Sequence, residues 1–459
     1  MTDRTTTMNR RETLVQQMTE HMTRLARMLS DWVQAEPRPL QEIEAQTVRV
    51  LHDLGTVLLT ALIPLAAPAR PAPDVPCPCG QTARYVRMRP ATVTTVLGRV
   101  TLERAIYRCP TCGEYHAPLD AQLQIAAGGI SLGLQELLAL LGATQDSFAQ
   151  AATVLERLCL VQVCPNSVRA ATEDLGAALA DHDQQIVTTA QTTGTPPPAE
   201  QTAAPRMYVS MDGVFAHTHD DGWKEIKTGC LYTTRSHVPR QRPDTLVIQA
   251  EQQSYVAALT DATTFGWRLW AEARRRGLTE QTELVALGDG APWIWNLVAE
   301  HFPQATQILD WYHASQYVWK AAATIFGETN EVRTSWVRQQ LDALWDGRVA
   351  DVLVVLERYR AKGEGVTDAL GYFTTHQARM NYPAYRARGL QIGSGPIESA
   401  CKQLVSARLK LAGMIWDQEG AEAVAVVRAW LKSDRWDAAM RLRPPPQRAY
   451  RRQAESAAA

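Results

Sequence analysis

The second half of the chain alternates short apolar runs with helical segments, and this pattern limits its fold more than any other feature. Runs rich in β-branched and aliphatic residues predict five strands, at residues 207–211, 227–233, 244–250, 283–288 and 306–309. A hairpin joins the early strands, and helical periodicity separates the later ones. Strands mixed with helices in this order indicate an α/β domain. Residues 312 to 388 then continue as helix, and a last helical stretch covers residues 396 to 432.

Three acidic residues stand in short signatures within this half. Asp212 follows the run Met-Tyr-Val-Ser-Met, and Asp289 follows Leu-Val-Ala-Leu-Gly, so both are expected where a strand ends. Glu398 follows Gly395-Pro396, which predicts a helix start with Gly395 as N-cap. Two strand-end acids and one helical acid can converge on a pair of divalent cations, as phosphoryl transfer requires. The plainer alternatives are an Asp-Gly turn at each strand end and a glutamate that favours the helix dipole.

Asp310 and His313 follow the strand at 306–309. If that strand neighbours the one before Asp289, the acid and the imidazole lie close to the three carboxylates. The alternative is that His313 only caps or packs within the next helix. Trp293, Trp295 and Trp311 lie near the acids in sequence, and we considered them for stacking on unpaired bases, with a core role as the alternative.

The first half contains two pairs of cysteines that predict a zinc site. Residues 1–70 form a helical region, and a Pro/Ala-rich stretch separates it from a β-rich module at residues 75–120. Within this module, Cys77 and Cys79 precede a predicted hairpin and Cys109 and Cys112 follow it, which is the arrangement of a zinc ribbon. The first pair has one intervening residue where two are usual. His116 is near enough to replace one thiolate, and a relic site without metal remains the alternative.

Two segments are candidates for DNA contact. The predicted hairpin is rich in arginine, and its candidate DNA contacts are Arg84, Arg87, Arg89, Arg99, Arg104 and Arg108. Residues 125–185 predict three helices that allow a helix-turn-helix, with Asn166 or Ser167 capping the last helix and Arg169 near its start. A solvated basic face and ordinary helix packing are the alternatives.

Composition limits the class of protein further. A chain of 459 residues predicts several domains, and its net charge of −1 gives no bulk preference for nucleic acid. No uninterrupted apolar stretch approaches the roughly 20 residues of a membrane span, and few cysteines in a long chain suit the cytoplasm. The Thr/Gln/Ala/Pro-rich segment at 186–205 predicts a linker, and the Pro/Arg-rich tail at 436–459 predicts loose order.

Taken together, these motifs resemble bacterial insertion-sequence transposases of the ISKra type. The motifs that carry the resemblance are Ser-Met-Asp-Gly at 210–213, Gly-Asp-Gly-Ala-Pro-Trp-Ile at 288–294, Leu-Asp-Trp-Tyr-His at 309–313 and Gly-Ser-Gly-Pro-Ile-Glu-Ser at 393–399. The resemblance covers residues 75 to 435. It implies a multidomain α+β protein whose RNase H-like domain, at 206–435, presents Asp212, Asp289 and Glu398 to two Mg²⁺ or Mn²⁺ ions. It further implies a helical insertion at about 312–390 and a supporting role for Asp310 and His313.

The resemblance implies a DNA transposase that cleaves transposon ends and joins them to target DNA. Its partners would be double-stranded DNA, at terminal inverted repeats and target sites, and a second copy of the chain in a dimer on DNA. The expected location is the bacterial cytoplasm, at the nucleoid. Two alternatives remain open: a catalytically inactive, domesticated transposase that binds DNA, and a metal-dependent nuclease without strand transfer.

Overall fold

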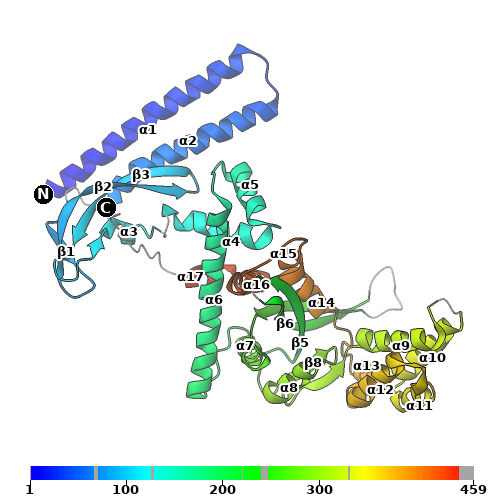
Figure 1. Ribbon diagram of the computed structural model, residues 1–459. Helices are drawn as coiled ribbons and strands as arrows, with labels where there is room; N and C mark the ends of the chain where they lie inside the picture. The colour runs from blue at the N-terminus through cyan, green and yellow to red at the C-terminus, as the bar shows by residue number, and fades with distance from the viewer. Residues whose placement is uncertain are drawn as a thin grey trace, which may run out of the picture. The chain divides into compact units, whose positions relative to one another are not determined.

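The computed structural model describes residues 2–66, 71–125, 129–219, 221–238, 247–328 and 331–443, with side chains from residue 11 onward. The chain divides into two compact units (Figure 1). The first comprises Met1–Thr172 with Arg443–Ala459, and the second comprises Glu173–Leu442. Most of the predicted tail lies outside the described residues.

The first unit begins with two long helices, as predicted. Helix α1 spans Thr2–Ala35, and α2 spans Leu40–Ala66 and returns beside it (Figure 1). By length and composition alone, α2 is the one helix of the described part of the chain that could cross a membrane. The sequence analysis did not identify it because Arg49, His52 and Asp53 interrupt the apolar run, whereas the average over the helix remains apolar.

A four-stranded antiparallel sheet follows, with strand order β1-β2-β3-β4. Its strands are β1 (Asp74–Pro76), β2 (Thr82–Thr95), β3 (Gly98–Arg108) and β4 (Tyr115–His116). The predicted hairpin is confirmed, and Gly98 supplies the positive φ of +105° that its tight turn needs. The short helix α3 (Pro118–Gln122) covers this sheet, where Leu119 packs on Val93 and Leu102.

Three helices complete the first unit and lead into the second: α4 (Leu132–Thr144), α5 (Phe148–Cys159) and α6 (Pro165–Thr193). Helix α6 begins at Pro165, so the predicted capping role of Asn166 or Ser167 is wrong. Proline suits a first helical position because its missing N–H would have no partner there.

Helix α6 also runs eight residues into the predicted linker, because Val187 and Ala190 are buried against neighbouring elements. Three threonine hydroxyls in this stretch donate to carbonyls four residues earlier, which satisfies them without breaking the helix. The segment after Thr193 is the part of the predicted linker that is not helical.

The second unit is built on a five-stranded sheet with order β7-β6-β5-β8-β9. Its strands are β5 (Arg206–Thr218), β6 (Gly222–His237), β7 (Val247–Ala258), β8 (Glu283–Gly288) and β9 (Thr306–Leu309). Strands β5, β6 and β7 pair antiparallel, and β8 and β9 continue parallel to β5. Helix α7 (Ala262–Arg275) connects β7 to β8, and α8 (Pro292–His301) connects β8 to β9.

A helical segment separates β9 from the helices that return to the sheet (Figure 1). It contains α9 (Trp311–Phe326), α10 (Glu331–Trp345), α11 (Val349–Arg358), α12 (Glu364–His376) and α13 (Tyr382–Ala387). Helix α14 (Gly395–Cys401) then contacts β5 and β6, and α16 (Gln418–Lys432) packs on β7. A break at residues 410–417 divides the predicted final helical stretch between α15 (Ala407–Leu409) and α16, and α17 (Trp436–Leu442) follows.

Candidate functional site

The sheet of the second unit aligns three aspartates side by side across the neighbouring strands β5, β8 and β9. In the parallel pair β5–β8, Ser210 is opposite Leu287, so continuing the register by two residues brings Asp212 opposite Asp289. In the pair β8–β9, Gly288 is opposite Leu309, and the amide of Asp310 donates to the carbonyl of Gly288 over 2.9 Å. Asp289 therefore neighbours Asp310 as well. Adjacent strands lie about 4.8 Å apart, so the three carboxylates form one row at the carboxyl ends of parallel strands.

Asp212 lies inside a strand rather than at its end. Strand β5 continues to Thr218 along β6, so the Asp-Gly turn does not form and the strand-end position predicted for Asp212 is wrong. One carboxylate oxygen accepts from the amide of Gly213 over 2.7 Å, and the other faces the thiol of Cys401 at 3.7 Å. Burial raises the pKa of Asp212, and the negative charge of Asp289 raises it further.

Asp289 follows β8 directly, as predicted. Its carboxylate accepts from the amide of Ala291 over 2.9 Å at the start of α8. The hydroxyl of Tyr372 in α12 donates to its backbone carbonyl over 2.5 Å, which ties the helical segment to the acids. Gly290, with φ of +107°, leaves room for this contact, because a Cβ there would lie 2.6 Å from the Tyr372 ring.

Asp310 and His313 form a pair at the start of α9. Asp310 is fully buried, and one of its oxygens accepts both the amide and the Nδ1 of His313, over 2.8 Å and 2.7 Å. Its other oxygen accepts the amide of Ser394 over 2.7 Å. The hydrogen bond to Asp310 raises the pKa of His313, and the charges of Asp289 and Asp212 raise it further. Asp310, rather than His313, therefore caps α9, and His313 also lies within the field of the acid row.

Glu398 reaches the same place from α14. Ser394 is the N-cap of α14, one residue before the predicted Gly395, and its hydroxyl donates to Glu398 over 2.8 Å. Among the described residues, Asp310, His313 and Glu398 form a group whose possible metal-ligand atoms all lie within 4.8 Å of one another. Five predicted residues thus meet at one edge of the sheet, with Glu398 exposed and Asp310 buried.

The tryptophans near the acids are mostly packing residues. Trp295 is buried, with only 5% of its surface exposed, which agrees with a core role and not with stacking on bases. Trp311 makes edge contacts with Trp345 and Tyr382 and is half-buried. Trp293 is also half-buried and lies below the Lys227 ammonium, 5.5 Å from the ring centre.

The four predicted cysteines meet in the first unit. Cys77, Cys79, Cys109 and Cys112 bring their sulfur atoms within 4.8 Å of one another and could hold a structural zinc ion. His116 Nε2 lies 3.1 Å from the Cys77 sulfur, so it competes for the same position. The backbone N–H of Cys112 lowers the pKa of Cys109 to about 6, which favours its thiolate, whereas burial and the neighbouring thiols raise the pKa values of Cys77 and Cys112. The short spacing of the first pair does not prevent the cluster.

The register of the β2–β3 hairpin sorts the candidate arginines by face. Arg84, Arg87 and Arg89 lie opposite Arg108, Ile106 and Arg104, so these residues share one face, and Arg99 is on the other. Arg104 is buried and forms an ion pair with Asp120, so its predicted contact with DNA is wrong. The remaining hairpin arginines are exposed, as is Arg169 on α6.

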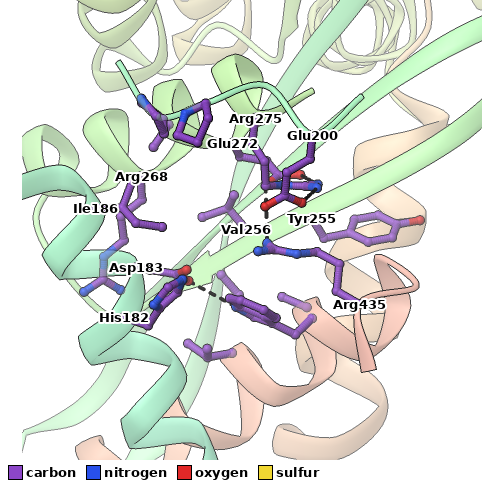
Figure 2. A pocket seen from close by; sticks show the side chains of 17 residues that line it. His182, Asp183, Ile186, Glu200, Tyr255, Val256, Arg268, Glu272, Arg275 and Arg435 are labelled. Atoms are coloured by element: carbon purple, nitrogen blue, oxygen red, sulfur yellow. Dashed lines mark hydrogen bonds and ion pairs between the residues drawn. The ribbon is translucent and has the colours of Figure 1, made fainter. Parts of the chain in front are cut away.

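A cavity lies within the second unit, and none of the residues of the acid site lines it (Figure 2). It has a volume of about 290 Å³ and lies between α6, β7, α7 and α16. Arg275 pairs with Glu272 and Glu200, and the Arg435 guanidinium lies 3.5 Å above the Trp430 ring. Sequence patterns did not predict this cavity, because charged residues on a helix are normally expected on its solvent-exposed face.

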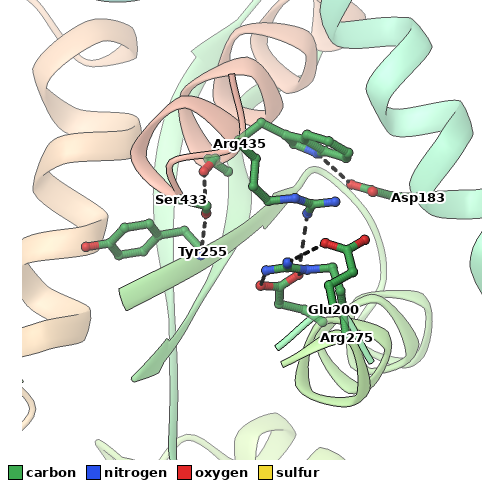
Figure 3. A network of polar contacts seen from close by, with 9 residues as sticks. Asp183, Glu200, Tyr255, Arg275, Ser433 and Arg435 are labelled. Carbon is green, nitrogen blue, oxygen red and sulfur yellow. Dashed lines mark hydrogen bonds and ion pairs between the residues drawn. The ribbon is translucent and has the colours of Figure 1, made fainter. Parts of the chain in front are cut away.

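The polar groups of this cavity chiefly satisfy one another (Figure 3). Asp183 accepts from the Trp430 indole over 3.2 Å, and burial raises its pKa to about 6. The Ser433 hydroxyl accepts the amide of Tyr255 over 2.8 Å, which caps an N–H on the edge strand β7. We assign this network to holding the helices over the sheet edge, where unpaired strand groups would otherwise be exposed.

The model of one protein family, described as an uncharacterised protein family (UPF0236), matches residues 35–439. The match spans both units and most of the chain, and the chain therefore belongs to that family. No curated protein matches the sequence.

Proposed function

We propose that this member of the UPF0236 family is a DDE transposase, which cleaves DNA at transposon ends and transfers the freed strand into target DNA. The observation that carries the proposal is the row of Asp212, Asp289 and Asp310 with Glu398 beside it. Acids gathered at one edge of a sheet repel each other unless a cation or a proton compensates them. A stable fold that keeps them together therefore points to a site that works on a charged substrate.

The sheet supports an RNase H-like catalytic domain. Three antiparallel strands, joined through the first to two parallel ones, give the order β7-β6-β5-β8-β9. In chain order Asp212 belongs to the first of these strands and Asp289 follows the fourth, which agrees with the proposed catalytic domain. The segment from α9 to α13 takes the place of the expected insertion, and α14 brings Glu398 back to β5 and β6.

The donor set fits hard divalent cations. Asp212, Asp289 and Glu398 offer carboxylate oxygens, which Mg²⁺ and Mn²⁺ prefer. Two such ions would stabilise the attacking and leaving oxygens of a phosphodiester. The raised pKa of Asp212 supports this assignment, because a carboxylate destabilised by burial and by Asp289 gains most from a bound cation.

Asp310 and His313 have positioning roles in this proposal. Asp310 joins β9, α9 and the loop before α14 through its contacts with His313 and Ser394, and Ser394 in turn holds Glu398. His313, with its raised pKa, places a positive charge beside the acids and can contact a phosphate. Losing either residue should misplace Glu398 or weaken substrate contact without removing the acids themselves.

The first unit supplies the proposed DNA-binding surface. Arg84, Arg87, Arg89 and Arg108 are exposed on the hairpin beside the cysteine cluster, around the buried Arg104 and Ile106 of the same face, and phosphate contacts need such a basic surface. Zinc would fix the ends of β2 and β3 and so hold this face in shape. In this proposal the protein acts on double-stranded DNA as a dimer, at the nucleoid in the bacterial cytoplasm.

The test is an assay of the full chain on DNA that carries the sequences flanking its own gene. With Mg²⁺ present, we expect specific strand cleavage that leaves 3′-hydroxyl ends and joined products with a second duplex. Cleavage without joined products would instead support a nuclease. Binding without cleavage, at any Mg²⁺ or Mn²⁺ concentration, would support a DNA-binding protein that has lost catalysis.

A further inference from the structure

Helices α1 and α2 pack along residues that are spaced by three or four positions over most of their length. On α1 these half-buried residues are Leu14, Met18, His21, Leu25, Leu29 and Trp32. On α2 they are Ile43, Thr47, Val50, Leu54 and Ala61. This is the spacing of helices that pack side by side over many turns. Only Val50 of α2 is fully buried, so the helical hairpin of α1 and α2 encloses almost no core of its own.

A second apolar stripe on each helix is exposed. On α1 it contains Val15, Met22 and Val33, and on α2 it contains Val48, Leu51, Leu58, Leu62 and Leu65. Their exposed fractions range from 37% for Val33 to 59% for Leu51. Every one of these α1 residues directly follows a residue of the contact stripe, and so do Val48, Leu51 and Leu62 on α2. The exposed stripes are therefore rotated by about 100° from the contact stripes in the same sense.

This shared offset places both exposed stripes on one side of the hairpin. The two helices face each other and run antiparallel, so equal rotations in sequence turn both stripes toward the same side. The β2–β3 hairpin contacts another face of α2, where Ile63 packs on Val93 and Leu102, and the Leu97 side chain at its turn lies against Gly55 at the border of the exposed stripe. Among the described elements, the other residues of the stripe stay exposed. The opposite side of α1 is mostly polar and contains Gln17, Glu20, Arg24, Arg27 and Asp31, together with the exposed Met28.

We propose that this apolar face binds the same face of a second copy, so that two hairpins form a four-helix bundle. From Val15 to Val33 the face is about 27 Å long, and two adjacent helices make it about 20 Å wide. Its flat area is therefore on the order of 500 Å², and its solvent-accessible area is larger because the side chains project from it. This approaches the roughly 800 Å² that each partner gives to a stable interface.

The chemistry of the face favours a second copy over a membrane. Its one charged residue is Glu44 at the edge, so two copies related by a twofold axis would meet without like-charge repulsion. Helices that lie on membranes usually carry Lys and Arg along the border of their apolar face. Here the border residues are Gln16, Thr19, Thr23 and Ser30 on α1. On α2 the second stripe is spaced by three, four or seven positions, which helix pairs also use. This inference does not depend on the proposed DNA chemistry.

Light scattering coupled to size-exclusion chromatography of the full chain, without DNA, tests the inference. We expect a dimer for the wild type and a monomer for L51E/L58E, with unchanged helical circular dichroism. The control Q17E/A35E adds the same charge on the polar side of α1 and should remain a dimer. If the double variant loses helix content, Leu51→Glu alone, at the most exposed position of the α2 stripe, takes its place.

Three outcomes would overturn the inference. A monomeric wild type would show that the face has another occupant. A dimer that persists at the same concentration in folded L51E/L58E would place the interface elsewhere. Flotation of the wild type with phosphatidylcholine vesicles, lost in L51E/L58E, would assign the face to a lipid surface.

Discussion

At the scale of single residues, the candidate site is a set of like charges held together by short contacts. Asp212 is buried beside Asp289, and its pKa is raised as a result. His313 has a raised pKa because Asp310 accepts its ring nitrogen and the other acids attract its proton. The folded protein therefore holds a destabilised carboxylate and a stabilised imidazolium in the same site, which is typical of residues kept for function.

Asp212→Asn is expected to raise the thermal stability of the protein in buffer without Mg²⁺ or Mn²⁺. Because the pKa of Asp212 is higher in the folded state, the wild type loses stability as pH rises through that pKa. The amide cannot ionise, so the difference between the two proteins should grow from acid to neutral pH. Thermal unfolding across this range measures it, with exposed Asp342→Asn as the control. Equal pH dependence of stability in all three proteins would show that ionised Asp212 does not destabilise the fold.

His313→Ala is expected to lower cleavage by roughly 10- to 100-fold, as losses of groups that orient ligands commonly do. The raised pKa adds a second readout: protonated His313 stabilises the fold below its ordinary pKa, and this stability is lost as pH rises through the raised value. The variant should therefore show a flatter decline in stability over that pH range. Exposed Tyr312→Ala is the control for both assays. Unchanged cleavage in His313→Ala would remove His313 from the site.

At the scale of elements, local patterns predicted strands that end at charged residues and failed where tertiary pairing extends a strand. The bounds of β8 and β9 agree with the sequence, because an acid and a turn follow each of them. Strand β5 continues six residues past Asp212, because β6 pairs with it along its whole length. No local signal distinguishes such a continuation from a turn at Asp-Gly.

The same limit applies to the candidate site. Its acids could be found because each stands in a short motif. Tyr372 and Cys401 could not, because they belong to helices that reach the site only through folding. Ser394 was within a motif, but its link between Asp310 and Glu398 depends on the loop that precedes α14.

Cys109→Ser is expected to remove bound zinc and to destabilise the β1–β4 sheet. The wild type should contain one Zn²⁺ per chain by elemental analysis, since four sulfur atoms form one cluster. Hydrogen exchange of residues 77–120 should increase in the variant while the second unit is unchanged. Cys164→Ser changes an exposed cysteine outside the cluster and should retain the metal. A stable wild type without zinc would mean that the cluster is a relic.

At the scale of the whole molecule, the two units divide the proposed work. The first carries the cysteine cluster, the basic face and the apolar face of the helical hairpin. The second carries the acids and the helical segment that contacts them through Tyr372. Membership of one family over residues 35–439 joins both units in a single protein architecture.

The basic face should account for part of the DNA affinity. R87E/R89E is expected to weaken DNA binding at all sequences and to reduce its dependence on salt by about one unit of slope for each lost phosphate contact. Fluorescence anisotropy at several salt concentrations measures both effects. Arg99→Glu, on the other face of the hairpin, should have a smaller effect. Equal losses in both variants would mean that the hairpin face does not define the contact.

The most direct test of the central claim is Mg²⁺-dependent cleavage of gene-flanking DNA by the wild type, Asp289→Asn and Asp342→Asn. Asp289 is the middle member of the row, because it lies between Asp212 and Asp310. We predict cleavage by the wild type and by Asp342→Asn, and none by Asp289→Asn, although all three bind DNA and remain folded. Cleavage by Asp289→Asn at the rate of the wild type would contradict the account.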